Sequence, residues 1–229
     1  MKKTQLILLV VFLLTFVTKS FAQRGKYDVT NGFSISGGLS QLDITTSNFI
    51  TSKGNGFAGG FLATADIPRQ WYNISFGMQI SESTIGISAR PTMASASDTN
   101  TFIDYKLFAT QLALLVNVKV VKNYFTIDVG PMLQYNSKLE LKDDSHENYH
   151  INNYSNLIAT DITDISQFNF NGVVGASLGI RNFKLRAQYI YGFTNILNKL
   201  DDNNLDTTGG EARLKGNMSM LILGATVSF

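Results

Sequence analysis

Apolar side chains occupy every second position along most of the chain after residue 30. In 183–194, Phe183 and Leu185 alternate with Lys184 and Arg186, so one face is apolar and the other is polar. A period of two residues is typical of a β-strand with two different faces. The same alternation predicts eight strands, at about 31–42, 57–67, 71–80, 102–120, 124–135, 168–180, 183–194 and 220–229.

The connections between these strands alternate in length. Those at 68–70, 121–123 and 181–182 are short, whereas those at 43–55, 82–100, 137–166 and 197–213 are long. Short turns at one end and long loops at the other are typical of outer-membrane barrels. We therefore predict an all-β fold, an eight-stranded antiparallel up-and-down transmembrane β-barrel with short periplasmic turns and long extracellular loops.

The first 22 residues have the pattern of a secretory signal peptide. Lys2 and Lys3 precede an apolar stretch of about a dozen residues, and small residues two apart precede Gln23. We expect cleavage after Ala22, which leaves the barrel domain 23–229. After residue 22, the chain has no apolar stretch long enough for a membrane-spanning helix.

Composition narrows the class further. Lys2, Lys3 and Lys19 leave with the signal peptide, so 19 basic residues become 16 against 17 acidic ones. This balance gives no reason to expect nucleic acid as a partner. The chain has no cysteine, so neither a disulfide framework nor a lipidated cysteine is available.

The direction of the apolar face separates two kinds of barrel. A soluble lipocalin-like carrier would turn this face inward, whereas a membrane barrel turns it toward lipid. Aromatic residues near strand ends, such as Trp71, Tyr135 and Phe168, favour the membrane barrel because they suit its two interfaces. The last predicted strand, which ends at Phe229, also favours it, because a closed barrel must pair its last strand with its first.

Several segments resemble a known family. They are the C-terminal run Leu221 to Phe229, the run from Leu112 through Val129-Gly130-Pro131, the segment Phe170 to Gly175, and Tyr189 to Ile196, which reads YIYGFTNI. Together they are similar to the PorT-like outer-membrane β-barrel family of Bacteroidota. The resemblance implies a barrel in the bacterial outer membrane, with outer-membrane lipid around it and the barrel-assembly machinery acting on the strand that ends in Phe229. Support of a secretion system, the role of the family's namesake, is not transferred.

An eight-stranded barrel is just wide enough for side chains to fill its interior. The alternation predicts that its inward residues include Asp66, Gln79, Gln111, Lys119, Asp128, Gln134, Lys184, Arg186 and Gln188, with small residues at Gly60, Gly77, Gly130, Gly175, Gly179 and Gly224. Buried charges are costly unless they are paired. We therefore expect Asp66 and Asp128 to find partners among the three cations and to form a structural polar interior.

Residues 146–150 read HENYH, which matches the H-E-x-x-H pattern of zinc proteases. That chemistry needs a helix and a third ligand, whereas the flanks are rich in Asp, Asn and Ser, and the chain has no other histidine. We interpret the match as a coincidence in a polar external loop. Asp201-Asp202-Asn203-Asn204 likewise matches no calcium loop, so we assign no catalytic, cofactor or metal residues and no cofactor.

The leading hypothesis is a non-enzymatic outer-membrane barrel. Its long loops would serve binding, adhesion or envelope maintenance, or support a secretion assembly through other envelope proteins. Two alternatives stay open at this point: an outer-membrane enzyme with its site at the loop end, and a secreted lipocalin-like carrier.

Overall fold

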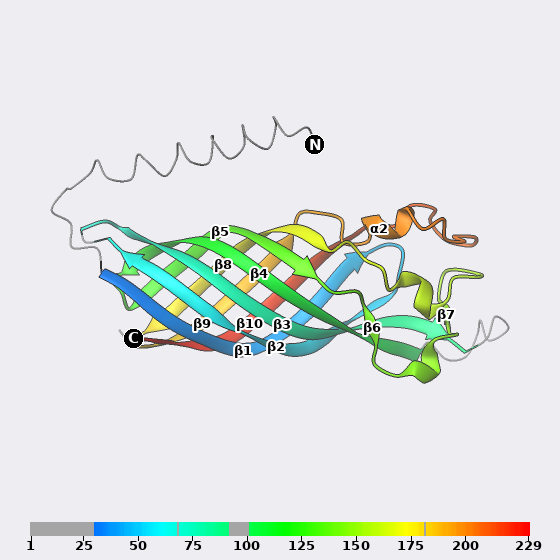
Figure 1. Ribbon diagram of the computed structural model, residues 1–229, viewed down its shortest axis with the longest axis horizontal. Coiled ribbons are helices and arrows are strands. Elements are labelled where there is room, and N and C mark those ends of the chain that lie inside the picture. Colours follow the sequence, from blue (N-terminus) through cyan, green and yellow to red (C-terminus); the bar gives the residue numbers. More distant parts are fainter. Residues whose placement is uncertain (1–29, 68, 92–100, 181) are drawn as a thin grey trace, which may run out of the picture.

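Eight long antiparallel strands form a closed ring (Figure 1). The computed structural model describes residues 30–67, 69–91, 101–180 and 182–229. The expected signal peptide, residues 1–22, lies outside them. The wall consists of β1 (Thr30–Thr46), β2 (Thr51–Asp66), β3 (Tyr72–Arg90), β4 (Thr101–Val121), β5 (Phe125–Asn136), β8 (Phe168–Gly179), β9 (Phe183–Gly192) and β10 (Gly216–Ser228).

Each wall strand pairs with its neighbours in sequence, and β10 pairs with β1 to close the ring. At this seam Ser34 lies opposite Ser228 and Gly38 lies opposite Gly224. Closure leaves no wall strand with an unpaired edge, which a barrel in lipid requires. The predicted up-and-down topology with eight strands is confirmed.

The connections at one end are short, as predicted. Two hydrogen bonds between Ile180 and Phe183 close the β8–β9 hairpin, and Tyr124 donates to the carbonyl of Val121 in the β4–β5 turn. At the other end, the prediction was wrong for two connections. The β1–β2 connection is only 47–50 rather than 43–55, and β3 continues to Arg90 instead of ending near residue 80.

The two faces of the wall match the prediction. Leu185, Leu223 and Val227 point outward and are 58%, 55% and 43% exposed, whereas the side chains of Lys119 and Arg186 are only 12% and 9% exposed. An exposed apolar belt around a polar interior suits lipid outside and side chains inside. The lipocalin-like alternative, which needs the opposite arrangement, is therefore wrong.

β3 was predicted too short because its apolar residues change from the outward to the inward face along the strand. In β3, Ile74, Phe76, Met78 and Ile80 face outward at even positions, but Ile85, Ile87 and Ala89 are buried inside at odd positions. In β4, Ile103, Tyr105 and Leu107 are likewise buried inside, before Leu112 and Leu114 turn outward. About ten residues of a tilted strand cross the bilayer, so strands of 19 and 21 residues extend beyond it.

The apolar residues change to the inward face because the loops fold over this end of the barrel and bury an apolar core inside it. The loops carry short elements: β6 (Glu140–Leu141), η1 (Asp144–His146), β7 (His150–Ile151), η2 (Ala159–Ile162) and α2 (Asn198–Asp201). Tyr154, Leu157, Ile162, Ile165 and Leu200 of the loops join Ile85, Ile103 and Tyr105 of the wall in this core. We call the loops 137–167 and 193–215 together the loop cap.

Aromatic pairs mark both ends of the apolar belt. Trp71 and Tyr72 lie edge to face at the turn end, and Tyr135 and Phe168 do so toward the loop end. Such girdles are typical of membrane interfaces. None of the helices in the described ranges is both long enough and apolar enough to cross a bilayer.

Candidate functional site: the barrel lumen

The lumen is built in layers, and the layer nearest the turns holds an ion pair. Lys119 on β4 donates to Asp66 on β2 with 2.8 Å between Nζ and Oδ1, and it also donates to the carbonyl of Ile67. Asn123 donates to the other carboxylate oxygen of Asp66. The expected pairing of Asp66 with a luminal cation is confirmed.

Asp128 on β5 is the centre of the next layer and is 2% exposed. Its Oδ1 accepts from Asn117 at 2.8 Å and from Thr126 at 3.0 Å, and its Oδ2 accepts from Ser177 at 2.7 Å. The Nε of Arg186 on β9 lies 3.8 Å from Oδ2, which makes an ion pair but not a hydrogen bond. The pairing of Asp128 with a cation is confirmed, while its hydrogen bonds come from neutral side chains.

Sequence reasoning missed these neutral partners. Asn117, Thr126 and Ser177 lie at inward positions of their strands, so their inward direction was readable from the alternation. Their contact with Asp128 depends on the registers β4–β5 and β5–β8, which place Asn117 opposite Asp128 and Ser177 opposite Thr126. Periodicity gives the face on which a residue lies but not the register between two strands, so these contacts were not available from it.

Amide side chains fill the middle of the lumen. Gln79 donates to Gln111, Gln111 donates to Gln134 at 2.9 Å, and Asn171 donates to Gln134 at 2.8 Å. The side chains of Gln111, Gln134 and Gln188 are buried. The glutamines predicted to be luminal therefore form a packed layer rather than the lining of an open channel.

Beyond the glutamines, the apolar core fills the loop end. The hydroxyl of Tyr105 in this core donates to the carbonyl of Ala159 at 2.9 Å. Arg90 at the end of β3 donates to the carbonyl of Tyr154 at 2.7 Å, which ties the loop cap to the wall. The loop cap is thus a folded part of the molecule.

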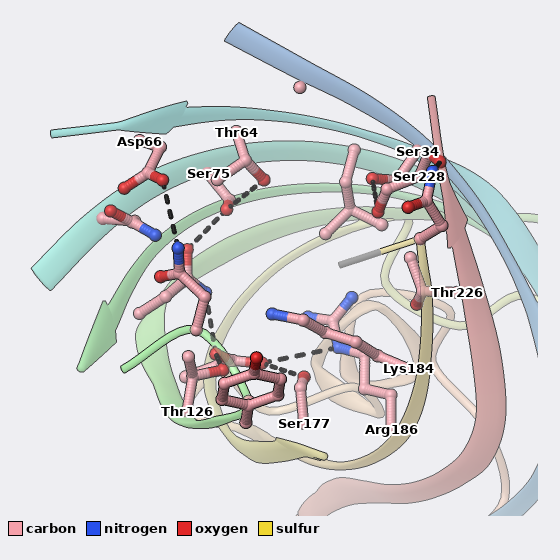
Figure 2. Close-up of a pocket in the computed structure, with 18 of the residues that line it drawn as sticks. Ser34, Thr64, Asp66, Ser75, Thr126, Ser177, Lys184, Arg186, Thr226 and Ser228 are labelled. Atoms are coloured by element: carbon pink, nitrogen blue, oxygen red, sulfur yellow. Dashed lines mark hydrogen bonds and ion pairs between the residues drawn. The ribbon is translucent and has the colours of Figure 1, made fainter. Parts of the chain in front are cut away.

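At the turn end the lumen is hollow. A cavity of about 990 Å³ is lined by residues from the wall and from the turns, among them Asp66, Asp128, Asn182, Lys184 and Arg186 (Figure 2). Figure 2 shows Lys184 and Arg186, both on β9, extending toward the side of the cavity that holds Ser177 and Thr126. The packed layers above it leave this cavity as a pocket that opens toward the turns.

The HENYH residues do not share a helix. His146 ends the 3-10 turn η1 and its ring lies 4.6 Å from that of Tyr149, whereas His150 belongs to β7 and pairs with Arg90 of β3. In the described part of the chain, no three His, Asp or Glu side chains are grouped to hold a metal ion. Asp201 ends α2 and accepts a hydrogen bond from the backbone of Leu214, so it caps a loop.

Comparisons with known proteins give structural neighbours only. No protein-family model matches the chain, and no curated protein matches it. The chain is similar to the crystal structure of Neisserial surface protein A, with TM-score 0.48 and 14% identity over 86% of this chain and 97% of that one.

Two further solved structures are similar. One is Ail, the attachment invasion locus protein of Yersinia pestis, in complex with the heparin analogue sucrose octasulfate, with TM-score 0.46 and 11% identity over 87% of this chain and 99% of that one. The other is outer membrane protein OprG from Pseudomonas aeruginosa, with TM-score 0.46 and 10% identity over 88% and 97%.

The strand pairing and the two faces of the wall define the class of the protein. A closed ring of eight antiparallel strands, with an apolar belt outside, aromatic girdles and a polar interior, is an outer-membrane β-barrel. The protein is therefore an integral β-barrel of the bacterial outer membrane.

Proposed function

We propose that this protein is a non-enzymatic, non-conducting barrel that holds its loop cap outside the cell as a binding surface. The observation that carries the proposal is the apolar core, which joins the loops 137–167 and 193–215 to the extended ends of β3 and β4. A chain that needed only to seal a barrel could do so with luminal side chains. A folded cap on top of filled layers instead gives a surface of fixed shape.

The charge of the loop cap indicates the kind of partner. The segments 137–167 and 193–215 contain ten acidic and five basic residues, and Asp143, Asp144 and Glu147 are exposed at one edge. An acidic surface attracts cationic partners and repels anionic ones. We infer a basic protein surface as the partner, such as that of an adhesion target or of another envelope or secretion protein.

A PorT-like identity would fit this proposal, because that family is one of outer-membrane barrels. Its specific role in secretion is a narrower hypothesis. An adduct with a component of a secretion system in the experiment below would support it.

Site-specific photo-crosslinking in living cells tests the proposed function. A photoreactive residue at Asn148, which is exposed in the loop cap, should give an adduct with a partner protein. The same residue at Leu178, on the outer wall near the turn end, is the control and should not give that adduct.

A variant with neutralised loop carboxylates gives a second test of the proposed binding surface. The triple variant Asp143→Asn, Asp144→Asn, Glu147→Gln should reduce the adduct at Asn148 several-fold while the barrel still folds, because these side chains are exposed. An adduct that is absent at Asn148, or one that persists unchanged in the triple variant, would contradict a binding surface that acts through acidic loops.

A further inference from the structure

The turn-end cavity holds cations that its carboxylates do not neutralise. Lys119 pairs with Asp66 at 2.8 Å, so these two charges cancel. Asp128 then remains as the counter-charge for both Lys184 and Arg186, whereas Lys184 makes no ion pair or hydrogen bond with the described residues. The cavity, which Lys122 also lines, therefore has an excess positive charge.

The N–H groups of Arg186 also have no hydrogen-bond acceptor among the described residues. Its side chain is only 9% exposed, yet it donates no hydrogen bond to any described residue, and its Nε is buried without a partner. A guanidinium has five N–H donors, and buried polar groups in proteins are nearly always hydrogen-bonded. Asp128 does not meet this demand, because its Oδ2 lies 3.8 Å from Nε, which is beyond hydrogen-bond distance.

The surroundings of these two cations are polar. The buried Thr226 hydroxyl also lacks a partner, and Ser228 and Ser34 line the same cavity, where their hydroxyls bond to each other at 2.8 Å. Figure 2 shows Thr226 beside Lys184 on the same side of the cavity. Donors of this kind, together with a guanidinium and an ammonium group, are what proteins use to hold an oxyanion.

From these observations we propose that the turn-end cavity is a binding site for a small oxyanion, a phosphate or phosphate ester, held by Lys184 and Arg186. The cavity of about 990 Å³ has room for an organic group attached to the phosphate. Because the glutamine layer and the apolar core fill the lumen above, the ligand enters and leaves at the turn end, which faces the periplasm. The site is independent of the loop cap and of its proposed partner.

Isothermal titration calorimetry on the detergent-solubilised full barrel tests this site. The probes are inorganic phosphate, glucose 6-phosphate and, as an uncharged control, glucose. At low ionic strength, both phosphates should bind and glucose should not. Since charge-assisted hydrogen bonds dominate the contact, Lys184→Met should weaken phosphate binding about tenfold or more.

Two further variants make the result specific to the lumen. Asp66→Asn should tighten phosphate binding, because it leaves the Lys119 ammonium without its counter-charge. Lys53→Met removes the same charge as Lys184→Met, but on an exposed side chain near the loop end, and should leave the affinity unchanged. Slower migration of boiled than of unboiled protein in gel electrophoresis shows that each variant is folded.

The role of Arg186 in binding is tested with a double variant, because removal of Arg186 alone would leave Asp128 buried and without a cation. The pair Arg186→Met with Asp128→Asn keeps the charge balanced and should also weaken phosphate binding. The proposal is overturned if the wild type binds no phosphate up to about 10 mM, or if Lys184→Met, in folded form, binds it as tightly as the wild type does. Equal binding of glucose and glucose 6-phosphate would likewise exclude an oxyanion site.

Discussion

The two carboxylates identified inside this barrel, Asp66 and Asp128, each have a cationic partner. Asp128 combines three hydrogen bonds from neutral groups with the nearby guanidinium of Arg186. Removal of one member of a buried pair costs more than the pair contributes, because the remaining charge is left uncompensated.

Asp128→Ala should therefore destabilise the barrel by about 3 to 5 kcal/mol, the typical cost of breaking a buried ion pair. The measurement is the midpoint of urea unfolding in detergent micelles, followed by gel mobility. The double variant Asp128→Asn, Arg186→Met should recover part of the loss, because no charge is then left alone. If Asp128→Ala destabilised the barrel less than the double variant does, Arg186 would have to be solvated by water in the cavity.

A carboxylate in the loop cap makes one contact between loops sensitive to pH. Asp164 lies 3.3 Å from Lys138 and 2.8 Å from Lys199, and the hydrogen bond from Lys199 is the main reason that the pKa of Asp164 is lowered. A carboxyl group whose pKa is lower in the folded state stabilises that state above its ordinary pKa of about 4. This contribution is lost as the pH falls from there through the lowered pKa.

We expect amide hydrogen exchange near 164 and 199 to increase below about pH 4, relative to the same segments at pH 6 after correction for intrinsic rates. Asp164→Asn should show the faster exchange already at pH 6 and little further change on acidification. The same acid response in wild type and variant would assign the sensitivity to other carboxylates. The effect should be small, because exposed ion pairs contribute little.

Strands meet closely where the ring closes, and glycine makes this possible. Gly38 and Gly224 lie opposite each other in β1 and β10, and a Cβ atom on Gly38 would lie 2.4 Å from the carbonyl oxygen of Leu223. This atom belongs to the backbone, so it cannot move without widening the seam. The neighbouring Gly37 has open space around a Cβ atom.

Gly38→Ala should therefore reduce the fraction of folded barrel, with a cost of about 1 to 3 kcal/mol from overpacking. Gly37→Ala is the matched control and should fold like the wild type. Gel mobility after refolding into detergent gives the folded fraction of each. Equal folded fractions would show that the seam can relax at Gly38.

The strands also show what periodicity can and cannot predict. The alternation in 183–194 correctly assigned Lys184 and Arg186 to the interior and Leu185 to lipid. It failed at residues 81–90, because from Ile85 onward the apolar residues lie on the inward face. The change of face is visible in the sequence at Ile85 and Ile87, but its meaning depends on the loop core that fills the barrel at this level.

The candidate sites were less predictable than the fold. The cations of the turn-end cavity were placed correctly by alternation, yet the hollow between them depends on how far the packed layers extend, which is a tertiary property. HENYH shows the opposite case, in which a matching sequence motif lacks the matching geometry. His146 lies in η1 and His150 lies in β7, so the two do not share a helix.

As a whole, the molecule combines three environments along its axis: a charged pocket at the turns, packed amides in the middle and an apolar core under the loops. The lipid belt surrounds the first two, as the exposed Leu223, Leu185 and Val174 indicate. Because the packed layers close the axis, we expect no steady single-channel conductance in planar bilayers. A stable conductance in the wild type would contradict the packed lumen.

The exposed apolar belt predicts that the cost of a charged residue on the lipid face depends on its depth in the bilayer. Leu223 pairs with Leu39 and Ala187 in the middle of the wall, whereas Leu178 pairs with Phe125 and Leu185 near the turns. An arginine on the lipid face costs about 2 to 4 kcal/mol at the midplane and about 0 to 1 kcal/mol near an interface. Leu223→Arg should therefore destabilise the barrel in lipid vesicles much more than Leu178→Arg, measured by urea or guanidinium unfolding. Equal effects would mean that the apolar face does not contact the hydrocarbon core, and the outer-membrane assignment depends on that contact.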